Sequence, residues 1–525
     1  MRKKILNSVL FLCFLGGLIF SSASAHAAVW YVDANAPLGG DGKSWATAFR
    51  DIQSAINSAS PFWMVCMAPY DQIYVRQGTY VLTGQINVNK VVSIYGGFDK
   101  MGNRDWKKNI TIIDGNDKVR CLNVTKPSVI NGFTIKNGNT PDYGGGVYID
   151  SSPVYCSMGD WYHTPIIKNC KITGNRAGIT GGGVYDIESD SKIVNCTFTE
   201  NYATNFGGGM YNLDSSPKVT DCLFHTNSSD EDGGGMYNWD SSPTITGCIF
   251  RDNQARDNGG GIHNGGGSPI MTNCTFISNV AHGHIDPMGG GGGMNNAYSS
   301  PIVTNCIFLN NYGRSYGGGM LNYSSWSTVT NCTFWNNSAI APGGGYGGGM
   351  YHFHGATEVI NCILWGDYPD EISNSTTSSP TVTYSDIQLP SLKVYPGTGN
   401  INADPLLADP VSEDVHLQPA SPCVDAGDNS ATYLPAEDFE GDPRIWPAGG
   451  TVDMGTDEWM GPPCQGDFED DGDVDGSDLA VFAADFGRTD CATGEECEGD
   501  FDNDDDVDGS DLAVFAADFG RTDCP

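Results

Sequence analysis

The residues best suited to chemistry lie in two acidic segments near the C-terminus. A loop that begins at Asp467 places oxygen donors at its positions one, three, five, seven, nine and twelve, and a loop that begins at Asp500 repeats this spacing. Oxygen ligands in this order surround a hard divalent cation, and calcium takes about six to eight of them. We therefore expect one calcium ion in each loop. The expected ligands are Asp467, Glu469, Asp471, Asp473 (through its backbone carbonyl), Asp475 and Asp478 in the first loop, and Asp500, Asp502, Asp504, Asp506, Asp508 and Asp511 in the second.

The two loops differ at their sixth position, where the chain must turn sharply. Gly472 stands there in the first loop and Asp505 in the second. Because a residue with a side chain adopts left-handed backbone at a cost, we expect the second site to be weaker or distorted. Each loop leads into Leu-Ala-Val-Phe-Ala-Ala-Asp-Phe-Gly, which predicts a helix with one buried side.

Two such loops, each followed by one helix within residues 462–525, resemble the EF-hand-like calcium module of type I dockerins. In that family the last ligand is aspartate, as it is at Asp478 and Asp511. The resemblance implies a cohesin-like protein partner. Gly476-Ser477 and Gly509-Ser510 stand where dockerins carry partner-selecting residues, so this chain departs from the family pattern there.

Four cysteines flank the two loops, namely Cys464, Cys491, Cys497 and Cys524. An exported chain can oxidise such cysteines to disulfides. We expect each disulfide to join the two ends of one repeat, Cys464 with Cys491 and Cys497 with Cys524, although four cysteines allow three pairings.

A second set of candidate residues recurs every 26 residues in the middle of the chain: Tyr185, Tyr211 and Tyr237, accompanied by the acids Glu188, Asp214 and Asp240. We expect the tyrosines to point outward as an exposed aromatic strip, which could bind sugar rings by stacking. The preferred interpretation is that the rings only stack on one another. The acids could bind a cation or share protons, but turn capping is the preferred interpretation because Asp214 and Asp240 open Asp-Ser-Ser-Pro turns.

These residues belong to a repeat that is built around one cysteine per unit. Cys170, Cys196, Cys222, Cys248 and Cys274 are 26 residues apart, and Cys306, Cys332 and Cys362 continue the series. Such self-similarity indicates stacked units that bury a shared core. One equivalent cysteine in each unit is best explained as a small core residue with a free thiol.

Each unit contains three short segments that predict three short strands: Gly-Met-Tyr-Asn, Val-Thr and Cys-Thr-Phe. The cysteine and the aliphatic residue three positions before it would point to opposite faces of one straight strand. The chain must therefore bend between them. We expect the asparagine just before the cysteine to point inward at this bend, and the asparagine five after the cysteine to mark another corner.

The in-register columns of Asn, Cys and Phe resemble the right-handed parallel β-helix of the pectin-lyase-like superfamily, with repeats similar to those of polymorphic outer-membrane proteins. The resemblance covers about residues 31–459 and implies an all-β, three-strand solenoid with the small helical calcium module at its C-terminus. It further implies a substrate groove along the tyrosine face. The family's lyases use carboxylate-held calcium with an Arg or Lys base, and its hydrolases use paired carboxylates. We divide the chain into a signal peptide (1–27), an N-terminal cap with the first turns (28–120), regular repeats (121–379), a C-terminal cap (380–461) and the dockerin-like module (462–525).

Charge and the N-terminus limit the possible partners and location. The formal net charge is −36, which disfavours nucleic acid because phosphates would be repelled. Arg2, Lys3 and Lys4 precede an apolar run and small-residue cleavage sites, as in a secretion signal. Outside this run no stretch approaches the ~20 apolar residues of a membrane helix. We expect a secreted or cell-surface protein without a transmembrane helix.

The predicted function is binding of a polysaccharide or a surface protein at the cell surface or in the extracellular matrix. One alternative is a dockerin-bearing polysaccharide lyase or glycoside hydrolase acting on polyuronides, and another is a structural spacer. No catalytic residue is assigned. Regular repeats favour binding, because catalysis normally interrupts one turn with a non-repeating charged cluster.

Overall fold

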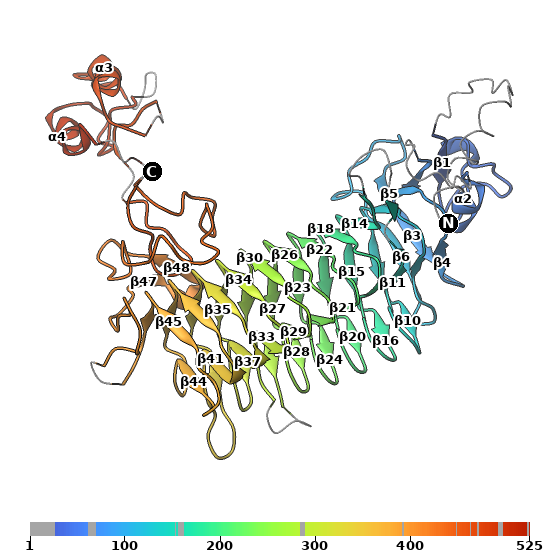
Figure 1. Cartoon of the computed structure of the whole chain (residues 1–525). Coiled ribbons are helices and arrows are strands. Elements are labelled where there is room, and N and C mark those ends of the chain that lie inside the picture. The colour runs from blue at the N-terminus through green and yellow to red at the C-terminus, as the bar shows by residue number, and fades with distance from the viewer. Residues whose placement is uncertain are drawn as a thin grey trace, which may run out of the picture.

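The computed structural model describes residues 27–60, 70–152, 154–155, 162–283, 289–390, 393–447, 449–461, 464–469, 472–491, 497–521 and 524. The predicted signal peptide lies outside the described residues, apart from residue 27. Figure 1 shows a long rod of stacked strands with helix α2 (Ile52–Ser58) at its N-terminal end. Helices α3 (Gly476–Asp485) and α4 (Gly509–Asp518) lie beyond its C-terminal end. Within the described residues, no helix is long and apolar enough to cross a bilayer.

Parallel strands form the walls of the rod, and in the described part of the chain they stack into three long sheets and a fourth, short one. The first sheet, sheet A, contains β1 (Val29–Val32), β2 (Gln72–Arg76), β5 (Ser93–Phe98), β8 (Val129–Asn131), β14 (Ile166–Lys168), β18 (Lys192–Val194), β22 (Lys218–Thr220), β26 (Thr244–Thr246), β30 (Ile270–Thr272), β34 (Ile302–Thr304), β38 (Thr328–Thr330), β42 (Glu358–Ile360) and β45 (Thr381–Thr383). Sheet B contains β3 (Gly78–Val81), β6 (Thr111–Asp114), β9 (Thr134–Lys136), β15 (Lys171–Thr173), β19 (Thr197–Thr199), β23 (Leu223–His225), β27 (Ile249–Arg251), β31 (Thr275–Ile277), β35 (Ile307–Leu309), β39 (Thr333–Trp335), β43 (Ile363–Trp365) and β46 (Asp386–Ile387).

Sheet C contains β4 (Ile86–Val88), β7 (Leu122–Val124), β11 (Val147–Asp150), β17 (Val184–Ile187), β21 (Met210–Leu213), β25 (Met236–Trp239), β29 (Ile262–Gly265), β33 (Met294–Ala297), β37 (Met320–Ser325), β41 (Met350–Gly355) and β44 (Ile372–Asn374). Sheet D consists of two-residue strands: β10 (Asn139–Thr140), β16 (Arg176–Ala177), β20 (Tyr202–Ala203), β24 (Ser228–Ser229), β28 (Gln254–Ala255), β32 (Val280–Ala281), β36 (Tyr312–Gly313) and β40 (Ser338–Ala339). The remaining elements are η1 (Trp45–Thr47), η2 (Pro410–Ser412) and the antiparallel pairs β12 (Val154–Tyr155) with β13 (Tyr162–His163) and β47 (Leu407–Asp409) with β48 (Asp414–Leu417).

The predicted right-handed parallel β-helix is therefore confirmed, and the three predicted strands of each turn form sheets C, A and B. Residues 26 apart lie side by side, as Met210 pairs with Met236 and Phe224 with Phe250. Sheet D was not predicted. A strand of two residues is too short to leave an alternating pattern in the sequence.

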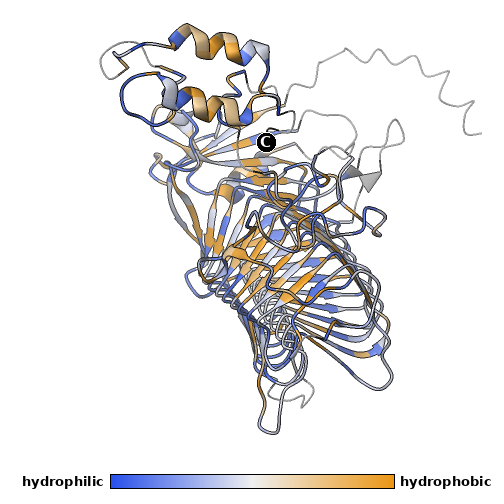
Figure 2. Cartoon of the chain, turned by 90° about the vertical axis from the view of Figure 1, so that its left-hand side faces the viewer, coloured by the Kyte–Doolittle hydropathy of each residue, from blue (hydrophilic) through white to orange (hydrophobic). Residues whose placement is uncertain are grey.

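The core is a set of columns that run along the rod. Figure 2 shows hydrophobic residues concentrated on its strands. Six phenylalanines (Phe198, Phe224, Phe250, Phe276, Phe308 and Phe334) are fully buried and stack with ring centroids 4.4–5.1 Å apart. The eight repeat cysteines from Cys170 to Cys362 are buried free thiols, which confirms that expectation. Helix α2 closes the N-terminal end by packing Ile52, Ala55 and Ile56 on this core.

The two asparagine columns exchange the roles expected from the sequence. The column five residues after the cysteine is fully buried, and each of its amides donates to the next turn, as Asn201 Nδ2 does to Asn227 Oδ1 at 2.9 Å. We call it the inner asparagine ladder; its members are Asn175, Asn201, Asn227, Asn253, Asn279, Asn311 and Asn337.

The column just before the cysteine lies on the outside of the bend between sheets A and B, so its expected inward direction was wrong. Its backbone is left-handed, with φ of 54° at Asn169 and 49° at Asn195. A single left-handed residue makes the turn and leaves its side chain outside the core, and Asn adopts this conformation more readily than most residues. We call these residues the outer asparagine column; its members are Asn169, Asn195, Asn273, Asn305, Asn331 and Asn361, with Asp221 and Gly247 in the two intervening turns.

The inner asparagine ladder ends on an acid instead of an amide. Asp367 Oδ1 accepts from the backbone N and from Nδ2 of Asn337, at 2.6 and 2.9 Å, while its buried Oδ2 has no hydrogen-bond partner. Glu371, also buried, lies beside it and accepts from the Asp367 backbone N at 3.2 Å. Burial raises the pKa of both carboxyl groups, and their mutual repulsion raises that of Glu371 further.

We expect this acid pair to destabilise the rod as pH rises. Both folded-state pKa values are raised, so the stabilising contribution is complete below the ordinary carboxyl pKa values and declines as pH rises through the folded ones. Asp367→Asn restores an amide donor and should stabilise the protein by about 1–3 kcal/mol near pH 8, with little effect near pH 5. Thermal unfolding followed by circular dichroism across this range measures the difference. Asp214→Asn, an exposed acid, is the control. Parallel pH profiles for the parent protein and Asp367→Asn would contradict the expectation.

Candidate functional site

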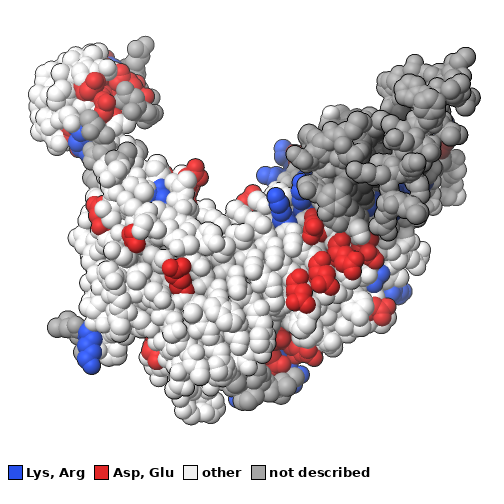
Figure 3. Space-filling view, in the orientation of Figure 1, with Lys and Arg blue, Asp and Glu red and all other residues white. Residues whose placement is uncertain are grey.

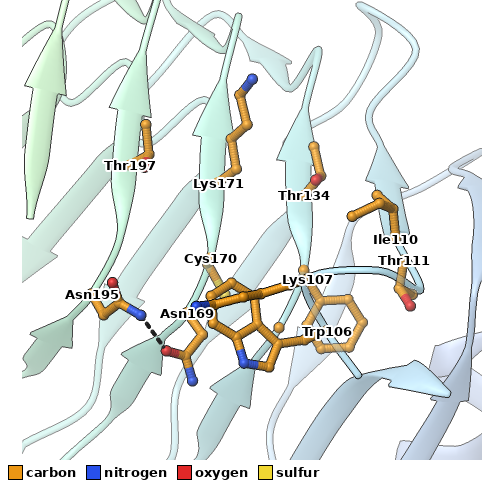
Figure 4. Close-up of a pocket in the computed structure, with 12 residues that line it drawn as sticks. Trp106, Lys107, Ile110, Thr111, Thr134, Asn169, Cys170, Lys171, Asn195 and Thr197 are labelled. Carbon is orange, nitrogen blue, oxygen red and sulfur yellow. Dashed lines mark hydrogen bonds between the residues drawn. The ribbon is translucent and has the colours of Figure 1, made fainter. Parts of the chain in front are cut away.

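A pocket of about 350 Å³ opens on the flank of the rod, near its N-terminal end. Figure 4 shows residues of three successive sheet B strands, Thr134, Lys171 and Thr197, along one side and Trp106 with Lys107 on the other. Its lining residues are Trp106, Lys107, Ile110, Thr111, Gly132, Phe133, Thr134, Asn169, Cys170, Lys171, Asn195 and Thr197. The volume is at the lower end of the range for ligand pockets.

The wall of this pocket is a loop that interrupts the regular turn. In later turns one left-handed residue connects sheet A to sheet B, whereas residues 99–110 connect β5 to β6. Gly97 and Gly132 let this loop pack closely, since a Cβ on either would lie less than 3 Å from Trp106 atoms. The Arg104 guanidinium fastens the loop to the rod by donating to the carbonyl oxygen of Gly96 at 3.0 Å.

The pocket carries positive charge on a strongly acidic protein. Lys107 and Lys171 line it, and no acidic residue stands among its lining residues, although the chain has a net charge of −36. Of the 27 lysines and arginines, 15 lie between Arg76 and Lys218. In the view of Figure 3, charged side chains of both signs gather on the N-terminal half of the rod, whereas the C-terminal half is largely uncharged. The pocket is therefore suited to an anion.

Two amides and an indole complete the pocket. Asn195 Nδ2 donates to Asn169 Oδ1 at 2.7 Å (Figure 4). Asn169 Nδ2 in turn donates to Asn131 Oδ1 at 2.9 Å. Each amide nitrogen has a second N–H that these bonds do not use. The Lys107 Nζ lies 5.5 Å from the centroid of the Trp106 ring. An aromatic ring beside amide and ammonium donors can hold an acidic sugar through stacking and charge-assisted hydrogen bonds.

This pocket was not predicted from the sequence, although the sequence contains a signal for it. Arg104-Asp105-Trp106-Lys107-Lys108 is a non-repeating charged cluster that interrupts a turn. It lies before the regular repeats, where no neighbouring copy reveals that it is an insertion.

The tyrosine column does not form the expected exposed strip. Tyr185, Tyr211 and Tyr237 are only 5%, 8% and 2% exposed, and their rings stack on one another with centroids 5.3 Å apart. Phe206 covers two of them, with ring contacts to Tyr211 and Tyr237. Burial raises the pKa of Tyr211 to about 12. Ring-on-ring packing, the preferred interpretation, describes what the structure shows, whereas the expected exposure of the strip was wrong.

The acids beside the tyrosines lie in exposed turns. Glu188, Asp214 and Asp240 have left-handed backbone, with φ of 48°, 47° and 46°. Within the described part of the chain, none of the groups of three potential metal ligands includes these acids. Their placement agrees with a role in the turns.

The second acidic loop, which begins at Asp500, gathers its carboxylates into two groups. Potential ligand oxygens of Asp500, Asp502 and Asp504 lie within 4.8 Å of one another, and so do those of Asp506, Asp508 and Asp511. Asp500 accepts from the backbone N of Asp504 and Asp505, each at 3.2 Å, so the loop curls around its first carboxylate. Asp505 takes the left-handed turn position with φ of 76°, as expected for the residue that replaces glycine.

The first loop follows the same plan. Potential ligand oxygens of Asp473, Asp475 and Asp478 lie within 4.8 Å of one another, and Gly472 N donates to Asp467 Oδ2 at 3.1 Å. Glu469 precedes this turn in the described chain, and Asp471 lies outside the described residues. Burial opposes ionisation of Asp478, but hydrogen bonds from the backbone N of Asp475 and Phe468 lower the pKa of this carboxyl overall.

These residues fit a hard cation. The Asp506 Oδ1 atom is buried without a hydrogen-bond partner, and all of the clustered donors are carboxylate oxygens. Reduced hydration together with neighbouring carboxylates raises the pKa of Asp502 and Asp506. A bound divalent cation would relieve this repulsion and satisfy the free oxygen.

The disulfides join different cysteines from those expected. The bonded pairs are Cys464 with Cys524 and Cys491 with Cys497. Each loop pairs with the segment that follows the other helix, since Val474 N donates to Arg521 O at 2.9 Å and Val507 N to Arg488 O at 2.9 Å. This crossed arrangement brings the first cysteine of the module next to the last one.

Comparisons with known proteins agree with the fold. A family model described as a right-handed β-helix region matches residues 119–285. A search of curated proteins found no match. Among solved structures, a pectate lyase is 14% identical with a TM-score of 0.41, and the match covers 82% of this chain and 96% of that one. A rhamnogalacturonan lyase is 11% identical with a TM-score of 0.29, covering 70% and 91%, and a protein of Geobacillus virus E2 is 13% identical with a TM-score of 0.32, covering 68% and 61%. The family-model match agrees with the right-handed parallel β-helix seen in the structure.

Proposed function

We propose that this protein is a secreted binding protein that holds an anionic polysaccharide in the pocket beneath Trp106, and that its C-terminal module binds calcium. The observation that carries the first part is a pocket with two lysines and no acid on a chain of net charge −36. Trp106 supplies an apolar surface, and Lys107 and Lys171 supply charge for the carboxylates of a uronate chain.

Binding fits this pocket better than catalysis does. A uronate lyase needs a base and a cation that neutralises the substrate carboxylate, and a hydrolase needs paired carboxylates. The pocket's lining includes no acid to hold a cation or to serve as a pair. The binding experiment must therefore also test for lyase and hydrolase activity.

We expect Trp106→Ala to weaken binding of oligogalacturonate by about tenfold, because the sugar loses its stacking surface. Isothermal titration calorimetry on the full chain measures this loss. Trp326→Ala is the matched control, since Trp326 is 61% exposed and does not line the pocket. Equal losses in the two variants would refute the assigned site. Unsaturated uronate absorbance and reducing ends recorded in the same samples would reveal turnover and so favour the enzyme alternative.

The charge of the pocket gives a separate expectation. Lys171→Gln should lower affinity for oligogalacturonate about threefold to tenfold at low salt and by less at high salt, because salt screens an exposed ion pair. Lys218, on β22 of sheet A, is exposed and does not line the pocket. Lys218→Gln should therefore leave the affinity for oligogalacturonate unchanged. Binding of neutral and acidic oligosaccharides with equal affinity would contradict an anion site.

For the C-terminal module, the proposal is calcium binding in both loops, supported by the carboxylate groups and the free Asp506 oxygen. A cohesin-like partner remains part of the proposal only through the dockerin resemblance.

Calcium should raise the unfolding temperature of the module in the full chain, because a ligand that binds only the folded state stabilises it. Differential scanning calorimetry in calcium and in chelator measures the shift. Asp500→Asn, which removes charge at the first ligand of the second loop, should reduce it. Asp490→Asn, an exposed acid paired with Arg488 outside the loops, should not. A module transition that is insensitive to calcium would rule out this part of the proposal.

A further inference from the structure

A histidine in the C-terminal cap lies among carboxylates from three separate segments. His416, on β48, places its Nε2 atom 2.8 Å from Glu440 Oε2 and its Nδ1 atom 2.5 Å from Asp414 Oδ1. Asp457 belongs to a third segment, and one potential ligand atom from each of His416, Glu440 and Asp457 lies within 4.8 Å of the other two. One imidazole nitrogen and two carboxylate oxygens thus converge from parts of the chain that are distant in sequence.

Backbone hydrogen bonds hold the two carboxylates in place. The buried Asp438 accepts through Oδ1 from three consecutive backbone N atoms, those of residues 440–442, at 2.9–3.0 Å. These bonds fasten the turn that carries Glu440. Leu417 N donates to Asp457 Oδ2 at 2.7 Å and so joins the segment of Asp457 to β48. The three groups are therefore positioned by the fold of the cap.

One carboxylate oxygen of this cluster is left without a donor. Asp457 is only 5% exposed, and its Oδ2 atom accepts from the backbone as described above. Within the described part of the chain, no hydrogen-bond donor reaches its Oδ1 atom. A carboxylate at this depth is costly unless its charge is paired or coordinates a metal. The free oxygen of Asp457 therefore points to a ligand that is a cation.

Negative charge exceeds positive charge around the histidine. Asp438 and Asp442 lie close enough to interact electrostatically with the cluster, in addition to its three carboxylates. Among the described residues, the cations that act on these acids are His416 and Arg444. The buried Arg444 guanidinium already donates to two main-chain carbonyl oxygens, those of residues 455 and 456. A divalent cation at the cluster would compensate this excess of carboxylates.

We infer that His416 Nε2, Glu440 and Asp457 bind one divalent transition-metal ion, with zinc as the expected metal, and that this ion joins the three segments of the C-terminal cap. Calcium and magnesium take oxygen ligands, whereas an imidazole beside carboxylates suits zinc. Asp414 hydrogen-bonds the other ring nitrogen, and such a carboxylate is the usual support of a metal-bound histidine. The ion replaces the proton between Nε2 and Glu440. This site is independent of the pocket beneath Trp106 and of the acidic loops.

The test is a calorimetric titration of the full chain with zinc, in excess calcium so that the acidic loops do not compete. His416→Gln and Glu440→Gln should each weaken zinc binding at least about tenfold, because each removes one of three ligands. Glu440 is exposed, so its variant keeps the fold, which circular dichroism verifies. His225→Gln is the matched control, since His225 forms a similarly exposed ion pair with Asp252, at 3.3 Å, outside the cluster. Its zinc affinity should equal that of the parent protein.

Three results would overturn the inference. One is the absence of zinc binding by the parent protein in excess calcium, since an acidic cluster without selectivity would then explain the site. Another is an unchanged zinc affinity in both His416→Gln and Glu440→Gln. The third is an equal loss in His225→Gln, which would show that zinc binds to surface histidines in general.

Discussion

Seven buried asparagine amides run through the regular turns of the rod, and each donates a hydrogen bond to the turn that follows. Every Asn of the inner ladder from Asn201 to Asn337 also donates to a main-chain carbonyl, as Asn227 Nδ2 does to Phe198 O at 3.0 Å. A buried amide without partners costs about 1–3 kcal/mol, and a slip of one residue would strand these amides and turn the phenylalanines outward. The ladder therefore fixes the register of all of the sheets at once.

Fixed register determines what remains for function. With Met, Val, Cys and Phe facing inward and one left-handed residue at each outer bend, the regular turns present short, repetitive outer faces. A ligand site needs a concave, non-repeating surface. The rod obtains one by extending a single bend into the loop 99–110, which packs against Gly97 and Gly132 and holds Trp106 over three strands. The C-terminal cap uses the same bends further along the rod and covers them with the chain itself.

The repeat made the β-helix, its strands and its free cysteines predictable, because each column appears several times in the sequence. The direction of a side chain at a bend was harder to predict from the sequence than the strands were. Both columns consist mainly of asparagine, and the backbone conformation decides that Asn195 faces out while Asn201 faces in. The predicted exposure of the tyrosine strip was wrong for another reason. Phe206, in the loop that precedes β21, covers Tyr211 and Tyr237. The disulfide pairing depends on how the two loop–helix repeats of the C-terminal module pack against each other. The spacing of the cysteines in the sequence does not reveal this packing. The Trp106 pocket depends on an insertion that occurs once.

The central claim is that the N-terminal flank of the rod holds an acidic glycan against Trp106. A crystal structure of the full chain with a galacturonate trimer tests it most directly. The account predicts sugar density along Thr134, Lys171 and Thr197, with one ring against the Trp106 indole and carboxylates beside Lys107 and Lys171. A trimer bound instead on the tyrosine face, or on the C-terminal module with this pocket empty, would contradict it.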